Sequence, residues 1–239
     1  MKDWKSAGIL LLLLLLTISG CVPADVTETP VISLGTATQT AFAPAAAAPN
    51  YTPVVFSDFP GIFILSLNEG EHAHLFAYSP TDQPILRLTD GPWDDIAPAL
   101  SPDGTRIAFA SNRSGYWDLY LLELESGETT RLTNTKAYDG APSWSPDGAW
   151  LASENYYDNS LDIFIQSISD SSQEPIRLTN DPGADHSPAW APKGRQLAFV
   201  TTRNGDSEVF LADLDDTSDG RFINLSNTPL ANESHPVWS

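Results

Sequence analysis

The stretch Trp144-Ser145-Pro146-Asp147-Gly148 is one copy of a unit that recurs through most of the chain. Related copies read Leu100-Ser101-Pro102-Asp103-Gly104 and Trp190-Ala191-Pro192-Lys193-Gly194, and Trp238-Ser239 matches the opening of another. A second marker keeps step with it at Leu88-Thr89, Leu132-Thr133, Leu178-Thr179 and Leu225-Ser226, at spacings of 44 to 48 residues. A repeat of this length is typical of stacked supersecondary units, and about 40 to 50 residues is the length of a propeller blade.

One repeat, residues 139–180, predicts four short strands. Strands are expected at 142–144, 150–153, 161–168 and 175–179, with a polar turn at 155–159. In the turn at 145–148, Pro146 presets φ and Gly148 accepts a positive φ, which indicates a type I turn followed by a glycine bulge. Asn159 occupies the column that holds Gly115 and Gly205 in the neighbouring repeats. The repeat is therefore expected to form an antiparallel meander.

A column of prolines sets the orientation of each sheet. Pro98, Pro142, Pro188 and Pro236 all begin the first strand of a repeat. Proline cannot donate a ladder hydrogen bond, so it belongs at a strand start or a sheet edge. We therefore expect the first strand to be the inner edge of each blade. The residues two positions later, Trp144, Trp190 and Trp238 with Leu100, should pack between adjacent blades.

The first and last units are incomplete in a complementary way. Residues 61–67, 73–79 and 84–89 resemble the second, third and fourth strands of a blade, whereas 235–238 resembles a lone first strand. Two arrangements follow from this pattern. The sequence is a piece of a longer protein, which we favour, or four blades close into a ring by pairing the last strand with the first unit.

Several columns recur together: an acid three residues before the proline, Trp-Ser-Pro-Asp-Gly, Ile/Leu-Ala-Phe, Arg-x-Gly before an Asp or Glu, and Arg-Leu-Thr. This pattern resembles TolB-type β-propeller repeats from Gly61 to Ser239, with departures in the first unit, at Leu100 and at Lys193. The resemblance implies an all-β propeller of four-stranded blades. It further implies a periplasmic or cell-surface module that binds protein partners. The same repeats also form the propeller that caps prolyl-oligopeptidase-like peptidases.

The N-terminus predicts export. Lys2 and Lys5 precede an unbroken leucine run from Leu10 to Leu16, and the apolar stretch is too short to span a bilayer. Ile18-Ser19-Gly20-Cys21 resembles a bacterial lipobox, in which the cysteine is acylated and becomes the new N-terminus. The alternative is an ordinary signal peptide with a chance cysteine. We expect a lipoprotein signal peptide at 1–20, a disordered Thr/Ala/Pro-rich tether at 21–53, and the propeller at 54–239.

Composition excludes some partners. The formal net charge is −19, and such a surface repels phosphate backbones, so nucleic acid is not an expected partner. No cofactor is expected. The chain has no Gly-x-Ser-x-Gly, phosphate-loop or His-Glu-x-x-His motif, so a catalytic site within it is not expected.

An acidic column is the candidate binding site. Asp95, Asp139, Asp185 and Glu233 each lie three residues before a column proline, and His186 and His235 lie beside them. These side chains could ring one mouth of the channel and hold a cation or a basic peptide. The alternative is that each carboxylate serves its own inter-blade loop. A transition-metal site is not the expected role of the histidines.

A second acidic column, Asp118, Asp162 and Glu208, begins the third strand. We expect it to make a structural hydrogen bond or ion pair, with Arg113 or Arg203 of the preceding turn as its partner. His72 and His74 are expected at the surface.

Two functions remain open. The first is a lipid-anchored binding module in the periplasm or at the cell surface, with a protein or peptide partner. The alternative is the non-catalytic propeller of an exported peptidase whose hydrolase domain follows residue 239.

Overall fold

The structure is a computed structural model that describes residues 61–79, 84–228 and 230–239. The predicted signal peptide (1–20), Cys21 and the tether (21–53) lie outside the described residues. Within the described part, no helix has the length and apolarity to cross a membrane.

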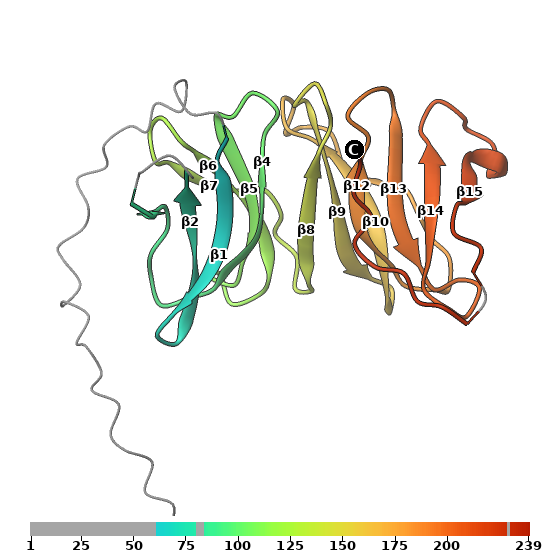
Figure 1. Ribbon diagram of the computed structural model, residues 1–239, viewed down its shortest axis with the longest axis horizontal. Helices are drawn as coiled ribbons and strands as arrows, with labels where there is room; N and C mark the ends of the chain where they lie inside the picture. The colour runs from blue at the N-terminus through green and yellow to red at the C-terminus, as the bar shows by residue number, and fades with distance from the viewer. Residues whose placement is uncertain (1–60, 80–83, 229) are drawn as a thin grey trace, which may run out of the picture. The chain divides into compact units, whose positions relative to one another are not determined.

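Four antiparallel sheets follow one another in chain order and lie side by side (Figure 1). The first sheet contains β1 (Phe63–Glu69), β2 (His72–Tyr78) and β3 (Leu86–Arg87). The second contains β4 (Asp95–Leu100), β5 (Arg106–Ser111), β6 (Asp118–Glu123) and β7 (Thr129–Arg131). The third contains β8 (Asp139–Trp144), β9 (Trp150–Tyr157), β10 (Ser160–Ser167) and β11 (Ile176–Arg177). The fourth contains β12 (Asp185–Trp190), β13 (Gln196–Thr201), β14 (Glu208–Asp213) and β15 (Phe222–Asn224), with a short 3₁₀ turn (Asp219–Arg221) before β15.

These sheets confirm the predicted blades, and one prediction within the third was wrong. The polar turn was expected at 155–159, but β9 and β10 pair as far as Tyr157 and Ser160. Only Asp158 and Asn159 remain in the turn, with φ of 49° and 70°. Two positive φ values in a two-residue loop match the right-handed twist of the flanking strands. Asn159 therefore does take the positive φ of the glycine column.

The first strand of each complete sheet is an edge strand that carries a bulge beside its proline. The register slips between Ile96 and Ala99 in β4, and at the corresponding places in β8 and β12. The residue before each column proline has a positive φ, between 46° and 53°, at Ala97, Ala141, Ser187 and His235. Such a φ is uncommon outside glycine. No local pattern predicts this bulge, because alanine, serine and histidine share no turn preference.

Packing between sheets forms the core, in which Trp144 and Trp190 take part as predicted, whereas Trp238 is 39% exposed. Trp144 is 8% exposed between the second and third sheets, and its Nε1 donates to the Ala99 carbonyl oxygen at 2.9 Å. Trp190 packs against the cluster between the third and fourth sheets. Pro142, Pro188 and Pro236 line a shared hollow of about 560 Å³, which confirms that the first strands face one another.

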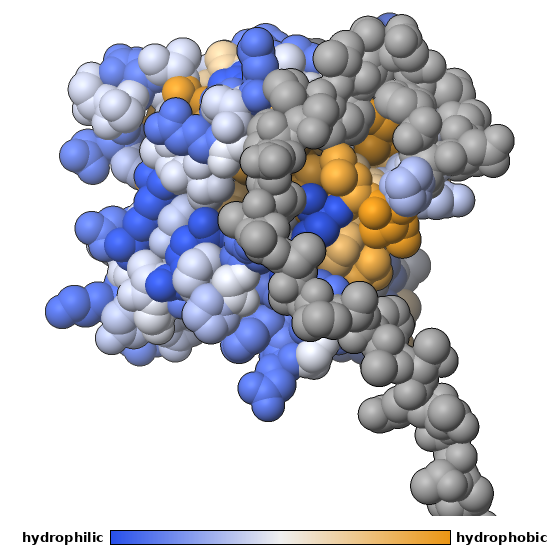
Figure 2. Space-filling view, turned by 90° about the vertical axis from the view of Figure 1, so that its left-hand side faces the viewer, coloured by the Kyte–Doolittle hydropathy of each residue, from blue (hydrophilic) through white to orange (hydrophobic). Residues whose placement is uncertain are grey.

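Residues 235–238 repeat the path of a first strand without joining a sheet. Trp238 Nε1 donates to the Ala189 carbonyl oxygen at 2.9 Å, as Trp144 does to Ala99. The segment lies beside the fourth sheet, and β1 pairs only with β2 among the described residues. The alternative of ring closure by this pairing is thus not formed in this structure. The first sheet carries exposed apolar side chains, and Figure 2 shows apolar atoms gathered on that side of the molecule.

Candidate binding site

The first acidic column lies at the start of β4, β8 and β12 and is buried. Asp95, Asp139 and Asp185 are at most 1% exposed. Glu233 occupies the same position in the last unit, because its N–H donates to the Ser207 carbonyl oxygen as that of Asp139 donates to Trp117. Glu233 is half-buried and accepts hydrogen bonds from the hydroxyls of Ser226 and Thr228.

In the second and fourth sheets an arginine from the β-turn folds back onto the acid. Arg113 Nη2 donates to Asp95 Oδ1 at 2.9 Å, and its Nε donates to Ser111 Oγ at 2.9 Å. Its guanidinium lies over the rings of Phe109 and Tyr120, at 5.3 and 4.7 Å from their centroids. Arg113 is thereby held by a carboxylate, a hydroxyl and three aromatic faces, the third being that of Trp93 at 5.1 Å.

The fourth sheet repeats this arrangement. Arg203 Nη2 lies 3.3 Å from Asp185 Oδ1, and its Nε donates to Thr201 Oγ1 at 3.0 Å. Its guanidinium lies over Phe199 and Phe210, at 5.6 and 4.8 Å from their centroids. Burial raises the pKa of Asp185, while hydrogen bonds from threonine hydroxyls and the charge of Arg203 oppose that shift.

The third sheet keeps the acid and lacks the arginine. The strand register places Tyr157 where Arg113 and Arg203 stand. Asp139 Oδ1 accepts from Asn155 Nδ2 at 2.9 Å, and Oδ2 accepts from Thr135 Oγ1 at 3.0 Å. In the described part of the chain no arginine or lysine forms an ion pair with Asp139. Burial consequently raises the pKa of Asp139, against hydrogen bonds from threonine and asparagine side chains.

A pocket of about 1030 Å³ opens beside Asp139, between the second and third sheets. One wall is the connection 132–137, and the other is formed by β9, β10 and β11. Ser153 lines this pocket at the position that Phe109 and Phe199 fill in the sister sheets, where both rings are fully buried. Gln166 also lines it, is 8% exposed, and has no hydrogen-bond partner for its Nε2.

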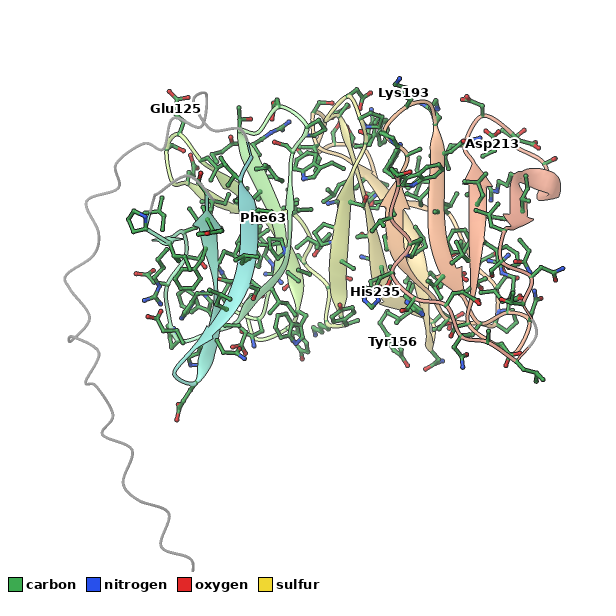
Figure 3. All side chains as sticks on the ribbon, viewed as in Figure 1. Phe63, Glu125, Tyr156, Lys193, Asp213 and His235 are labelled. Carbon is green, nitrogen blue, oxygen red and sulfur yellow. The ribbon has the colours of Figure 1, made fainter. Side chains whose placement is uncertain are left out.

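The histidines of the predicted site lie apart from this pocket. His186 is half-buried, and its Nδ1 lies 3.1 Å from Ser187 Oγ. His235 is exposed and lies at the same edge of the molecule as Tyr156, opposite Lys193 (Figure 3). Within the described ranges, no group of three or more His, Cys, Asp or Glu side chains is placed to hold a metal ion.

The second acidic column makes structural ion pairs at Asp118 and Asp162 and hydrogen bonds at Glu208, as predicted, but the predicted arginine partners were wrong. Asp118 accepts from Arg131 at 2.6 Å, and Asp162 accepts from Arg177 at 2.8 Å. Both arginines come from the fourth strand, directly before the Leu-Thr marker. Arg113 and Arg203 instead turn to the first column. Glu208 accepts from the amides of Asn204 and Asn224.

The prediction for one N-terminal histidine was also wrong. His74 is 3% exposed in β2, and its Nδ1 has no hydrogen-bond partner. Burial is the main cause that lowers the pKa of its imidazole, followed by the charge of Arg87. His72 is half-buried, with its Nδ1 at 3.4 Å from Asp94.

Sequence reasoning missed Ser153, Asn155, Tyr157 and Gln166 as members of a possible site. The signal was present in the alignment of the repeats, because each of these residues departs from its column. At Ser153, a small polar side chain in a column of buried phenylalanines indicates missing core volume. That departure is visible only once the columns are assigned to a common face.

Together the blades and their contacts define a β-propeller built from four-stranded antiparallel units. A family model described as the TolB beta propeller domain matches residues 80–171 and 118–239, which is more than half of the chain. The protein therefore belongs to the TolB beta propeller domain family.

Individual relatives cover part of the chain. The Tol-Pal system protein TolB of Francisella tularensis subsp. mediasiatica is 38% identical over 87 residues, which is 36% of this chain and 20% of that protein. The match thus spans about a fifth of the length of such relatives. The crystal structure of TolB from Acinetobacter baumannii aligns with a TM-score of 0.62 and 25% identity, over 67% of this chain and 41% of that one.

A peptidase shares the fold as well. A puromycin-hydrolyzing peptidase from Mycobacterium tuberculosis aligns with a TM-score of 0.53 and 16% identity, over 69% of this chain and 29% of that one. At this identity the likeness concerns the fold alone.

Proposed function

We propose that the protein is an exported, membrane-anchored β-propeller that binds a protein or peptide partner in the periplasm or at the cell surface, without catalysis of its own. Membership of the TolB beta propeller domain family is the observation that carries this proposal. Relatives named as Tol-Pal system proteins support a role at the cell envelope. The chain's own sequence adds Cys21 after a short leucine-rich segment, which supports lipid anchoring.

Binding is tested by placing a photo-crosslinking amino acid at two opposite edges of the propeller. Tyr156 and Lys193 are suitable, because they lie at opposite ends of the sheets (Figure 3). Lys193 lies in an exposed turn and Tyr156 is an exposed residue near the end of β9, so substitution should not disturb the core. We expect a discrete adduct in living cells from one position and not from the other. Absence of an adduct from both positions would contradict a binding role for these two faces.

Anchoring is tested by Cys21→Ser. Wild-type protein should incorporate labelled fatty acid and sediment with membranes, because two or more acyl chains give stable anchoring. The Cys21→Ser variant should lose the label and move to the soluble fraction, whereas Ser33→Ala in the same segment should behave as wild type. A Cys21→Ser variant that stays in the membrane fraction would refute the lipid anchor.

The second candidate is the propeller of an exported peptidase, which the shared fold with puromycin-hydrolyzing peptidases favours. The reading frame beyond codon 239 separates the two candidates. Further blades alone would support the binding module. A Gly-x-Ser-x-Gly motif after the last blade would support the peptidase.

A further inference from the structure

The sister sheets show what the pocket beside Asp139 is shaped to hold. In the second and fourth sheets the equivalent space is filled by the turn arginine and by a phenylalanine from the second strand. Phe109 and Phe199 are fully buried, and Arg113 and Arg203 have side chains only 19% and 13% exposed. A guanidinium in this position is an integral part of the packed interface between two sheets.

The third sheet has the surroundings of that guanidinium without the guanidinium itself. The acid remains as Asp139, the hydroxyl position holds Asn155, and the aromatic platform of the third strand remains as Phe164. All three line the pocket. Tyr157, which replaces the arginine, is 53% exposed, and its ring lies 5.8 Å from that of Phe164 at a tilt of 58°.

A second observation is independent of the acid. Gln166 stands where the second and fourth sheets have Leu122 and Ala212. It is more than nine-tenths buried, lines the pocket, and its Nε2 has no partner. A buried polar group without a partner loses its hydrogen bonds to water and gains none in return, so a ligand that bonds to it is favoured. An amide can present either its oxygen or its nitrogen to such a ligand, since the two orientations occupy the same volume.

Charge around the opening favours a cation. Asp158 and Glu174 line the pocket with Asp139, on a chain whose formal net charge is −19. Arg177 is the positive side chain on the wall, and it is already engaged by Asp162 Oδ2 at 2.8 Å and by the Thr179 carbonyl oxygen at 3.0 Å. Acidic surroundings raise the local concentration of basic ligands and speed their association.

We propose that this pocket binds an arginine side chain of a partner protein, which supplies from outside the guanidinium that Arg113 and Arg203 supply within their own sheets. The guanidinium pairs with Asp139, whose oxygens keep free lone pairs beside Asn155 and Thr135. Its flat face lies on Phe164, and its peptide occupies the rest of the pocket. A planar group with several donors suits this setting better than the compact ammonium of lysine. The inference deepens the proposed binding function by naming the chemistry of the partner.

The test is a calorimetric titration of the full chain, in detergent if it partitions into membranes, with three peptides. Acetyl-Gly-Arg-Gly-amide should bind measurably. The citrulline peptide, of nearly the same shape without the charge, should bind at least tenfold more weakly. The lysine peptide should fall between them. Equal binding of the arginine and citrulline peptides, or no heat from the arginine peptide, would overturn the proposal.

Two variants locate the binding. Tyr157→Arg restores the residue of the sister sheets and should occupy the pocket itself, so peptide binding should fall at least tenfold while the melting temperature does not fall. Tyr116→Arg places the same charge on an exposed turn of the second sheet and should leave binding within twofold. Asp139→Asn should abolish the preference for arginine over citrulline. Unchanged binding in Tyr157→Arg would show that the peptide sits elsewhere.

This experiment is independent of the membrane assay and the crosslinks. If the arginine peptide gives no heat while anchoring and crosslinks are intact, the arginine pocket is refuted and the proposed binding module stands. If anchoring and crosslinks are lost while the arginine peptide binds, the proposed binding module is refuted and the arginine pocket stands.

Discussion

The third and fourth sheets have the same strand register, although the third has a shorter hairpin turn, and they pack differently against the sheet before them. The fourth sheet presents Phe199 and Arg203, and the interface is filled. The third presents Ser153 and Tyr157 in these positions, and a pocket of about 1030 Å³ remains. Three side chains, with Gln166 in place of Ala212 as the third, therefore separate a packed interface from an open one, while the strand register is the same.

The comparison shows which parts of a blade are interchangeable. The buried acid is kept in all three complete sheets, with an arginine as its partner in two and neutral donors in the third. Turns and bulges that set the backbone are also kept. The columns that face the neighbouring sheet can change without loss of the blade, and they are where a site can arise.

The largest expected effect comes from emptying a filled interface. Phe199→Ala should lower the free energy of unfolding by about 3–5 kcal/mol, because it removes a fully buried ring. The matched change in the third sheet, Ser153→Ala, should cost less than about 1 kcal/mol, since the space beside it is already open. Urea unfolding of both variants measures the difference. Equal losses would mean that the third sheet is packed like the fourth.

An intermediate effect is expected from the buried acids. Asp95→Asn leaves the largely buried Arg113 without its carboxylate and should cost about 2–4 kcal/mol at pH 7. Asp139→Asn should be neutral or slightly stabilising, because Asp139 has no cationic partner to lose. Thermal or urea unfolding at pH 7 compares the two. A loss of more than about 2 kcal/mol for Asp139→Asn would show that its charge stabilises the fold.

Comparison of the wild type with the Asp139→Asn variant also predicts a pH dependence of stability. Burial raises the pKa of Asp139 above 3.8, so the folded protein holds this proton more tightly than the unfolded chain. Wild-type stability should therefore decline as pH rises from about 3.8 through the raised pKa, and the Asp139→Asn variant should lack this part of the decline. The difference between the two stability curves isolates Asp139 from Asp162 and Asp185, whose pKa values are also raised by burial.

The smallest expected effect comes from repairing a turn in the fourth sheet. In the second sheet, Asp103 Oδ1 accepts from Ser101 Oγ at 2.6 Å and from the Thr105 N–H at 3.1 Å. The fourth sheet has Ala191 and Lys193 in these positions. The double change Ala191→Ser with Lys193→Asp should raise the free energy of unfolding by about 0.5–1 kcal/mol.

Unfolding at low pH provides the control for this double substitution. Hydrogen bonds from Ser101 and Thr105 lower the pKa of Asp103 from 3.8 to about 2. Such a turn therefore stabilises the fold at pH values above the ordinary aspartate pKa, and this stabilisation is lost as the pH falls toward 2. The gain from the repaired turn should fade over the same range. A gain that persists at pH 2, or no gain at pH 7, would mean that the turn bonds are not its source.

The sequence alone determined the blades, because their signals are local. Turn residues such as Pro146 and Gly148 fix φ, and the spacing of the markers places every strand to within a few residues. It also identified the acid columns, since a carboxylate that recurs once per repeat can be recognised from its spacing alone. Asn159 was assigned a positive φ from its column, and the structure agrees.

Only the tertiary structure decided which groups meet. Arg113 reaches Asp95, which is 18 residues away, in preference to the nearer Asp118, and Arg131 takes Asp118. Strand pairing and the bulge at Ala97 determine which arginine meets which aspartate. Neither feature can be predicted from a local sequence pattern. The pocket beside Asp139 depends on Ser153, Tyr157 and Gln166 facing the same neighbouring sheet. Empty volume is a property of two packed surfaces, so no single stretch of sequence can specify it.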